Sequence, residues 1–78
     1  IKNKKPAPDI FIEASKRLNV PINQCVVFED AINGVEAAKS AGAFCVGITS
    51  SFSGDELLDA GADSIIQTFF DDIKLLEN

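Results

Sequence analysis

Short apolar runs alternate with amphipathic segments along this chain of 78 residues. Three runs, at residues 24–28, 44–48 and 64–67, are rich in β-branched residues and typical of buried strands in a parallel sheet. The segments around them repeat apolar residues at helical spacing, which predicts helices over about 8–18, 33–41, 55–60 and 71–76. This alternation indicates an α/β fold, in which a parallel sheet of about three strands carries helices on both faces.

The ends of these helices carry local signals. Asn19 and Gly42 stand where a residue in the left-handed conformation commonly ends a helix. Ser53 and Glu56 have the spacing of a capping box, in which each side chain bonds the other residue's backbone N–H. The buried face of the first helix is expected to comprise Ile10, Phe11, Ala14 and Leu18.

The first strand is apolar on both faces, as expected of a strand inside a sheet. Three parallel strands are few for a self-sufficient sheet, and an open strand edge favours pairing with another segment. The chain begins with Ile1 and contains no Met. We therefore expect a fragment of a longer protein, in which an upstream segment pairs with this edge.

The formal net charge of −5 disfavours nucleic acid and anionic membranes as partners. No apolar run approaches the roughly 18 residues that span a bilayer, and no signal peptide is recognisable. Cys25 and Cys45 each lie in an apolar run, which favours inert thiols in a reducing cytoplasm, with a disulfide between neighbouring strands as the alternative. Because the chain has no His, Ser–His and Cys–His nucleophile systems are excluded.

Two adjacent carboxylates, Glu29 and Asp30, follow the first strand. Ligands of parallel α/β sheets bind beyond the carboxyl ends of the strands. Neighbouring acids repel each other, and their desolvation is costly unless a cation is present. Carboxylate oxygens suit Mg²⁺, so the pair is a candidate magnesium site. The alternative is that one carboxylate caps the next helix while the other is solvated.

Three segments together resemble the haloacid dehalogenase-like superfamily, and within it the β-phosphoglucomutase and small sugar-phosphatase branch. They are K-P-A-P-D-I-F at residues 5–11, V-F-E-D-A-I-N-G-V-E-A-A at 27–38 and L-L-D-A-G-A-D at 57–63. The first two form a specific pair at this spacing, and the resemblance runs along nearly the whole chain. It implies a Rossmann-like core, of which residues 1–78 would be the C-terminal part.

The resemblance also implies roles for single residues. Lys5 matches the family lysine that contacts the phosphoryl group and the nucleophilic carboxylate, where its charge would favour the transition state. The alternative for Lys5 is a solvated lysine near Lys2 and Lys4. Glu29 and Asp30 match the acidic magnesium ligands, with Asp30 the stronger candidate for direct contact. Gly34 would have a structural role, giving the chain room to turn close to the site.

Two features of the family pattern differ or are absent. Lys4 replaces the small residue that usually precedes the family lysine, and no Asp-x-Asp occurs in the chain. The nucleophile-bearing N-terminal part and the cap domain that selects the substrate are therefore expected to lie outside these residues. By themselves the 78 residues are expected to be inactive.

The resemblance thus implies a Mg²⁺-dependent phosphatase or phosphomutase that acts on a small phosphorylated substrate, such as a sugar phosphate, through an aspartyl-phosphate. A non-catalytic, flavodoxin-like binding domain of receiver type is the main alternative. A receiver should carry a phosphoacceptor Asp after a later strand, whereas Thr49 and Thr68 follow the later strands here. A third possibility is an interaction fragment with a vestigial site.

Overall fold

The computed structural model describes residues 7–67 of the chain. Its elements, in order, are α1 (Asp9–Leu18), the 3₁₀ helix η1 (Ile22–Gln24), β1 (Val26–Glu29), α2 (Ile32–Ala41), β2 (Phe44–Ile48), α3 (Gly54–Ala60) and β3 (Ser64–Ile66). The predicted order is confirmed in this part, but the first strand is shifted along the chain. Gln24 belongs to η1, Cys25 lies between η1 and β1, and Glu29, which was expected to follow the strand, is its last residue. The helix expected over 71–76 lies outside the described residues.

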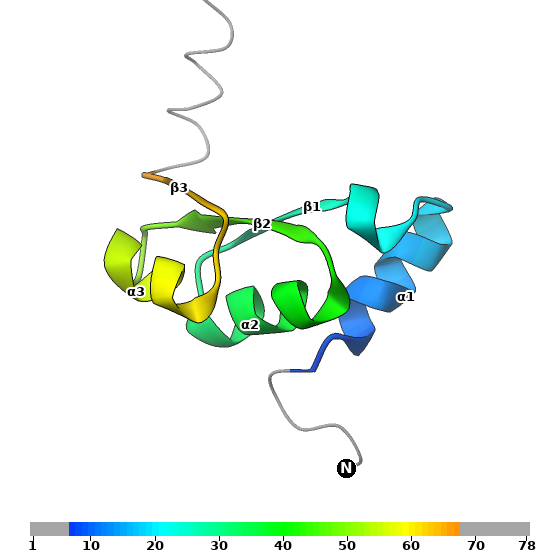
Figure 1. The fold of residues 1–78 in the computed structure, drawn as a ribbon, viewed down its shortest axis with the longest axis horizontal. Helices are drawn as coiled ribbons and strands as arrows, with labels where there is room; N and C mark the ends of the chain where they lie inside the picture. The colour runs from blue at the N-terminus through cyan, green and yellow to red at the C-terminus, as the bar shows by residue number, and fades with distance from the viewer. Residues whose placement is uncertain (1–6, 68–78) are drawn as a thin grey trace, which may run out of the picture.

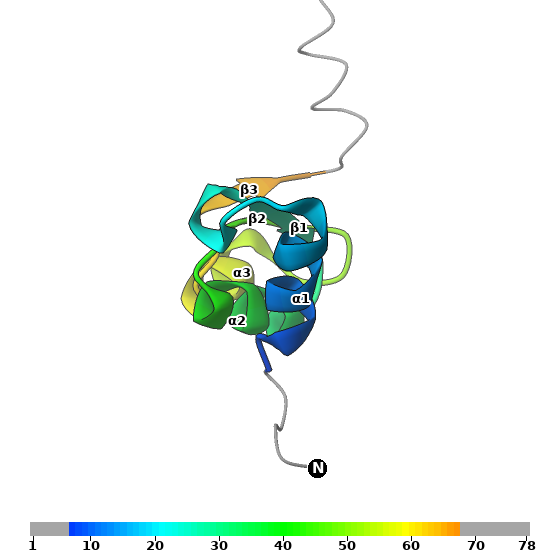
Figure 2. The ribbon, with the colours of Figure 1, turned by 90° about the vertical axis from the view of Figure 1, so that its right-hand side faces the viewer.

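The three strands form a parallel sheet in the order β1-β2-β3. Figures 1 and 2 show that α1, α2 and α3 all lie on the same side of it. Within residues 7–67 helices therefore cover one face, where both faces were expected to be covered. On the other face Val26 is 54% exposed and Phe44, its neighbour in register, is 47% exposed. The α/β fold class is nonetheless confirmed.

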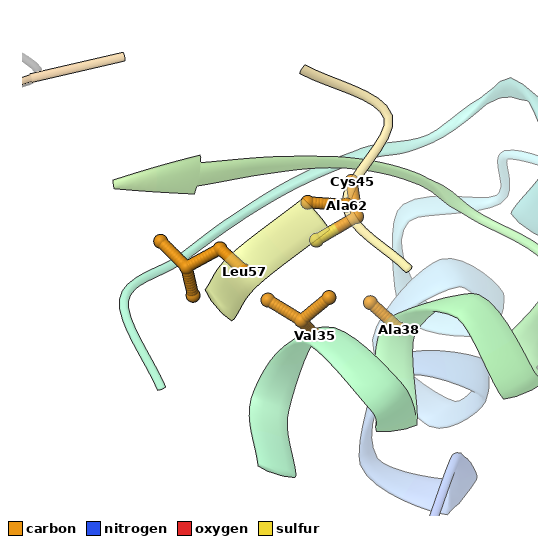
Figure 3. Close-up of a cluster of buried hydrophobic side chains, with 5 residues drawn as sticks. All are labelled: Val35, Ala38, Cys45, Leu57 and Ala62. Atoms are coloured by element: carbon orange, nitrogen blue, oxygen red, sulfur yellow. The ribbon is translucent and has the colours of Figure 1, made fainter. Parts of the chain in front are cut away.

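The core lies between β2 and the two helices that follow the first two strands (Figure 3). Its buried members are Val35, Ala38, Cys45, Leu57 and Ala62. Small residues allow close approach: a Cβ at Gly47 would lie only 3.1 Å from Cβ of Leu57. The apolar packing of α2 and α3 against the sheet is the main stabilising contribution in this part of the chain.

The packed face of α1 differs from the prediction. Ile10 is 72% and Leu18 69% exposed, and Ala14 is exposed as well. Phe11 packs against the core as predicted, and Ser15 is buried. Ser15 tolerates burial because its hydroxyl donates a 2.8 Å hydrogen bond to the carbonyl of Ile12. α1 packs on α2 and η1, and these contacts decide which face of α1 is buried. Helical spacing alone does not identify that face.

The helix-end signals are confirmed. Asn19 has φ 59° and Gly42 has φ 100°, both in the left-handed region. At the start of α3, Ser53 Oγ accepts a hydrogen bond from Glu56 N at 3.2 Å, and Glu56 Oε1 accepts one from Ser53 N at 3.0 Å. These bonds satisfy backbone donors that the first turn of the helix leaves unpaired.

At the amino ends of β2 and β3, Asp63 joins three elements. Its Oδ2 accepts 2.8 Å hydrogen bonds from Lys39 Nζ and from Cys45 N, and Lys39 also donates to the carbonyl of Ala43 at 2.9 Å. The hydrogen bond from Lys39, followed by that from the Cys45 backbone, lowers the pKa of Asp63. This cluster ties α2 to the sheet at the end opposite the acidic pair.

The cysteines are both free thiols, so the disulfide alternative is wrong. Cys45 is fully buried, whereas Cys25 is half-buried just before β1. Burial is the main cause that raises the pKa of the Cys45 thiol, which makes it a poor nucleophile. None of the helices in residues 7–67 combines the length and apolar character needed to cross a bilayer.

Candidate functional site

The acidic pair lies at the carboxyl edge of the sheet. Glu29 is the last residue of β1 and pairs in register with Gly47, so Asp30 begins the loop beside the end of β2. Thr49 and Ser50 follow the last residue of β2, so they also lie at the carboxyl edge of the sheet. Because the strands are parallel, polar residues from successive loops meet here.

Glu29 lies against the start of α2. Its Oε1 accepts a hydrogen bond from Ala31 N at 3.4 Å, and Ala31, the residue preceding the helix, has no side chain able to cap it. A carboxylate at this position is favoured by the positive end of the helix dipole. The capping role that the sequence left open for one carboxylate therefore falls to Glu29. A carboxylate has about four lone-pair sites, so oxygen capacity remains for a cation.

Gly34, in the first turn of α2, faces the Glu29 side chain. A Cβ built on Gly34 would overlap Cγ and Cδ of Glu29. The glycine thus leaves the space that the Glu29 side chain occupies. The role expected from the sequence, room for the chain to turn close to the site, stays a prediction.

Replacing a glycine inside a helix by alanine normally stabilises the helix by up to about 1 kcal/mol. We expect Gly34→Ala to show no such gain. The new methyl group must displace Glu29, so a net destabilisation of about 1–2 kcal/mol is expected. In a Glu29→Ala background the same replacement should be neutral or stabilising. Urea unfolding of the four proteins measures this as a double-mutant cycle, and additive effects would contradict the packing described here.

Asp30 is exposed and contacts a different element. Its Oδ2 accepts a hydrogen bond from Ser50 Oγ at 3.2 Å. Ser50 was not identified from the sequence, although the polar Thr-Ser-Ser run after the second strand is a signal that could have suggested it. The two adjacent acids are therefore held by different partners, Glu29 by the start of α2 and Asp30 by the loop after β2.

A cavity of about 390 Å³ lies beside Glu29, between α1 and α2. Its lining residues are Ala7, Ile10, Phe11, Glu29, Ala31, Asn33, Gly34 and Ala37. Asp30 is not among them. Lys5 lies outside the described residues, but Ala7, only two positions further along, lines the same cavity as Glu29.

The donor set of this edge fits Mg²⁺ in kind. Glu29 and Asp30 offer hard carboxylate oxygens, which Mg²⁺ prefers. The two ion pairs formed among residues 7–67 are Glu13–Arg17 and Lys39–Asp63, so in this part neither site carboxylate is neutralised by a cationic side chain. The same residues contain no group of three or more His, Cys, Asp or Glu placed to hold a metal ion. The chain would thus contribute two ligands to a site completed by other groups.

Comparisons with known proteins agree on one family. The family model of haloacid dehalogenase-like hydrolases matches residues 1–42 of this chain, which include both the lysine segment and the acidic pair. A phosphorylated carbohydrates phosphatase from Thermotoga maritima is 46% identical over 69 residues, covering 86% of this chain and 32% of that protein.

Solved structures show the same similarity in three dimensions. A hydrolase from Pseudomonas syringae superposes with a TM-score of 0.85 at 35% identity, over 99% of this chain and 37% of that one. A Thermotoga maritima protein provisionally named a β-phosphoglucomutase has a TM-score of 0.72 at 47% identity, over 85% of this chain and 32% of its own. The chain thus spans about a third of the length of each of these relatives.

Proposed function

Because this chain belongs to the haloacid dehalogenase-like hydrolase family, we propose that residues 1–78 are the C-terminal part of the core domain of a phosphotransferase. The intact enzyme acts on a small phosphorylated metabolite, most simply a sugar phosphate, as a phosphatase or a mutase. The observation that carries this proposal is the position of Glu29 and Asp30 at the carboxyl end of β1, beside a cavity that Glu29 lines.

In this proposal Lys5 supplies positive charge to the phosphoryl group. Ala7 lines the cavity next to Glu29, and two residues of extended chain span at most about 7 Å. The chain length between Lys5 and Ala7 therefore permits the contact that we propose. Its ammonium group would stabilise charge that develops on the phosphoryl oxygens.

Glu29 and Asp30 are the proposed magnesium ligands. Bound Mg²⁺ would neutralise negative charge on the phosphoryl oxygens and on the carboxylates around them. Asp30 makes the more direct ligand, because it is exposed and contacts one serine hydroxyl, whereas Glu29 is partly engaged by the start of α2.

The nucleophile is proposed to come from an N-terminal segment outside these residues. That segment would pair with the edge of β1 that residues 7–67 leave open, and it would place an aspartate at the carboxyl end of the sheet. A carboxylate oxygen of this aspartate attacks phosphorus, forming an aspartyl-phosphate as the ester oxygen leaves and takes up a proton. Water, or a hydroxyl of a sugar phosphate, then takes the phosphoryl group and frees the carboxylate. Both cysteines are free thiols. Because thiols stay reduced in the cytoplasm, we propose that the enzyme is cytoplasmic.

A hybrid protein tests this proposal. The matching third of the Thermotoga maritima phosphatase is replaced by this chain, so that the nucleophile and cap come from the relative. We expect the hybrid to hydrolyse a phosphorylated carbohydrate when Mg²⁺ is present, and the isolated 78 residues to show no turnover. A hybrid with native far-UV circular dichroism but no activity would refute the proposal, as would turnover by the isolated chain.

A further inference from the structure

We propose that Ser50 is a positioning residue that orients the Asp30 carboxylate toward the metal site. This inference rests on the proposed function, since it gives Asp30 the role of a magnesium ligand. Ser50 lies 20 positions after Asp30, in the loop that follows β2, and its hydroxyl donates to Asp30 Oδ2 at 3.2 Å.

The loop that carries Ser50 is itself fixed to the sheet. Thr49 N donates to the carbonyl of Ile66 at 3.0 Å, and Thr49 Oγ1 donates to the same oxygen at 3.3 Å. Ile66 is the last residue of β3 and pairs in register with Ile48. The hydroxyl of Ser50 is therefore presented from a backbone anchored on both β2 and β3.

The Asp30 side chain has little else to orient it. It is exposed, and it follows the end of β1, so neither core packing nor the strand ladder fixes its rotamer. A serine hydroxyl that bonds one carboxylate oxygen leaves the other oxygen able to bind a cation. Partners of this kind orient metal ligands, and their removal typically weakens metal affinity by about 10- to 100-fold.

The first experiment measures the orientation without any metal. The Hα–Hβ couplings of Asp30 in the metal-free hybrid phosphatase report its χ1 rotamer, and we expect one dominant rotamer. Ser50→Ala should average the couplings, whereas Ser50→Thr, which keeps the hydroxyl, should preserve them. Ser51→Ala is the matched control, because the neighbouring Ser51 forms no hydrogen bond to Asp30. Unchanged couplings in Ser50→Ala would overturn the proposal.

The second experiment measures magnesium activation of the hybrid phosphatase. Ser50→Ala should raise the Mg²⁺ concentration that gives half-maximal activity by about 10-fold, with kcat at saturating Mg²⁺ changed by no more than about 2-fold, while Ser50→Thr restores the original value. An unchanged requirement in Ser50→Ala, with Asp30→Asn inactive, would refute the role of Ser50 alone. An Asp30→Asn hybrid that keeps full activity would instead refute the proposed function.

Discussion

Asp30→Asn in the hybrid phosphatase is expected to lower kcat/KM by about 10³-fold, because a catalytic metal contributes several kcal/mol and each 1.36 kcal/mol is tenfold in rate. The replacement keeps the size of the side chain and an oxygen that can accept the Ser50 hydrogen bond, but it removes the negative charge. The loss should therefore reflect metal binding rather than folding. Initial rates across a Mg²⁺ series provide the measurement.

A matched control separates charge at the site from charge elsewhere. Asp59→Asn makes the same chemical change on the exposed surface of α3 and should leave kcat/KM within about 2-fold, as expected for a surface substitution. If Asp59→Asn reduced activity as much as Asp30→Asn, general loss of negative charge would explain both results, and the magnesium role of Asp30 would be lost.

Leu57→Ala is expected to produce the largest loss of stability. Leu57, in α3, is fully buried. Its side chain packs over Gly47 of the sheet, where a Cβ built on the glycine would lie 3.1 Å from Cβ of Leu57. Removing a buried leucine side chain typically costs about 2–5 kcal/mol, which in a small domain is a large part of the total free energy of unfolding. Urea unfolding followed by far-UV circular dichroism should show the loss as a lowered midpoint.

The adjacent residue offers the control. Leu58 is 47% exposed, so Leu58→Ala leaves no internal cavity and should cost less than about 1 kcal/mol. Equal losses from the two replacements would mean that α3 does not dock through Leu57, and the core shown in Figure 3 would be wrong.

Local sequence signals predicted most of the fold. The strand over 44–48 was placed correctly because Gly42 ends the preceding helix and the polar residues from Thr49 onward end the apolar run. Ser53 and Glu56 likewise predicted the start of α3, since a capping box depends on residues only three apart. Signals of this kind act within a few residues and can be read without knowing the tertiary structure.

Contacts between distant segments could not be read in this way. The hydrogen bond from Lys39 to Asp63 spans 24 positions, and that from Ser50 to Asp30 spans 20. The packed face of α1 was predicted wrongly at Ile10, Ala14 and Leu18. Alternative faces of a helix differ by small rotations about its axis, and the contact with the neighbouring helix decides which of them is buried.

In the candidate site, too, local features were predicted from the sequence and contacts between distant segments were not. The positions of Glu29 and Asp30 at a strand end followed from the apolar run before them, but their separate partners did not. Gly34 was identified from a motif, and its contact with Glu29 supplies the physical reason for a glycine there. The catalytic role of Lys5 stays a prediction, because that residue lies outside the described part of the chain.

The edge position of β1 has a practical consequence. Within residues 7–67 the strand that ends at the acidic pair is one of the two edge strands of the sheet, and β3 is the other. A segment that adds to the sheet at the β1 edge would lie beside Glu29, so under the proposed function its docking would also assemble the reaction centre. If the proposed function holds, we expect residues 1–78 to serve as one part of a split-enzyme reporter, in which turnover signals that two polypeptides have met.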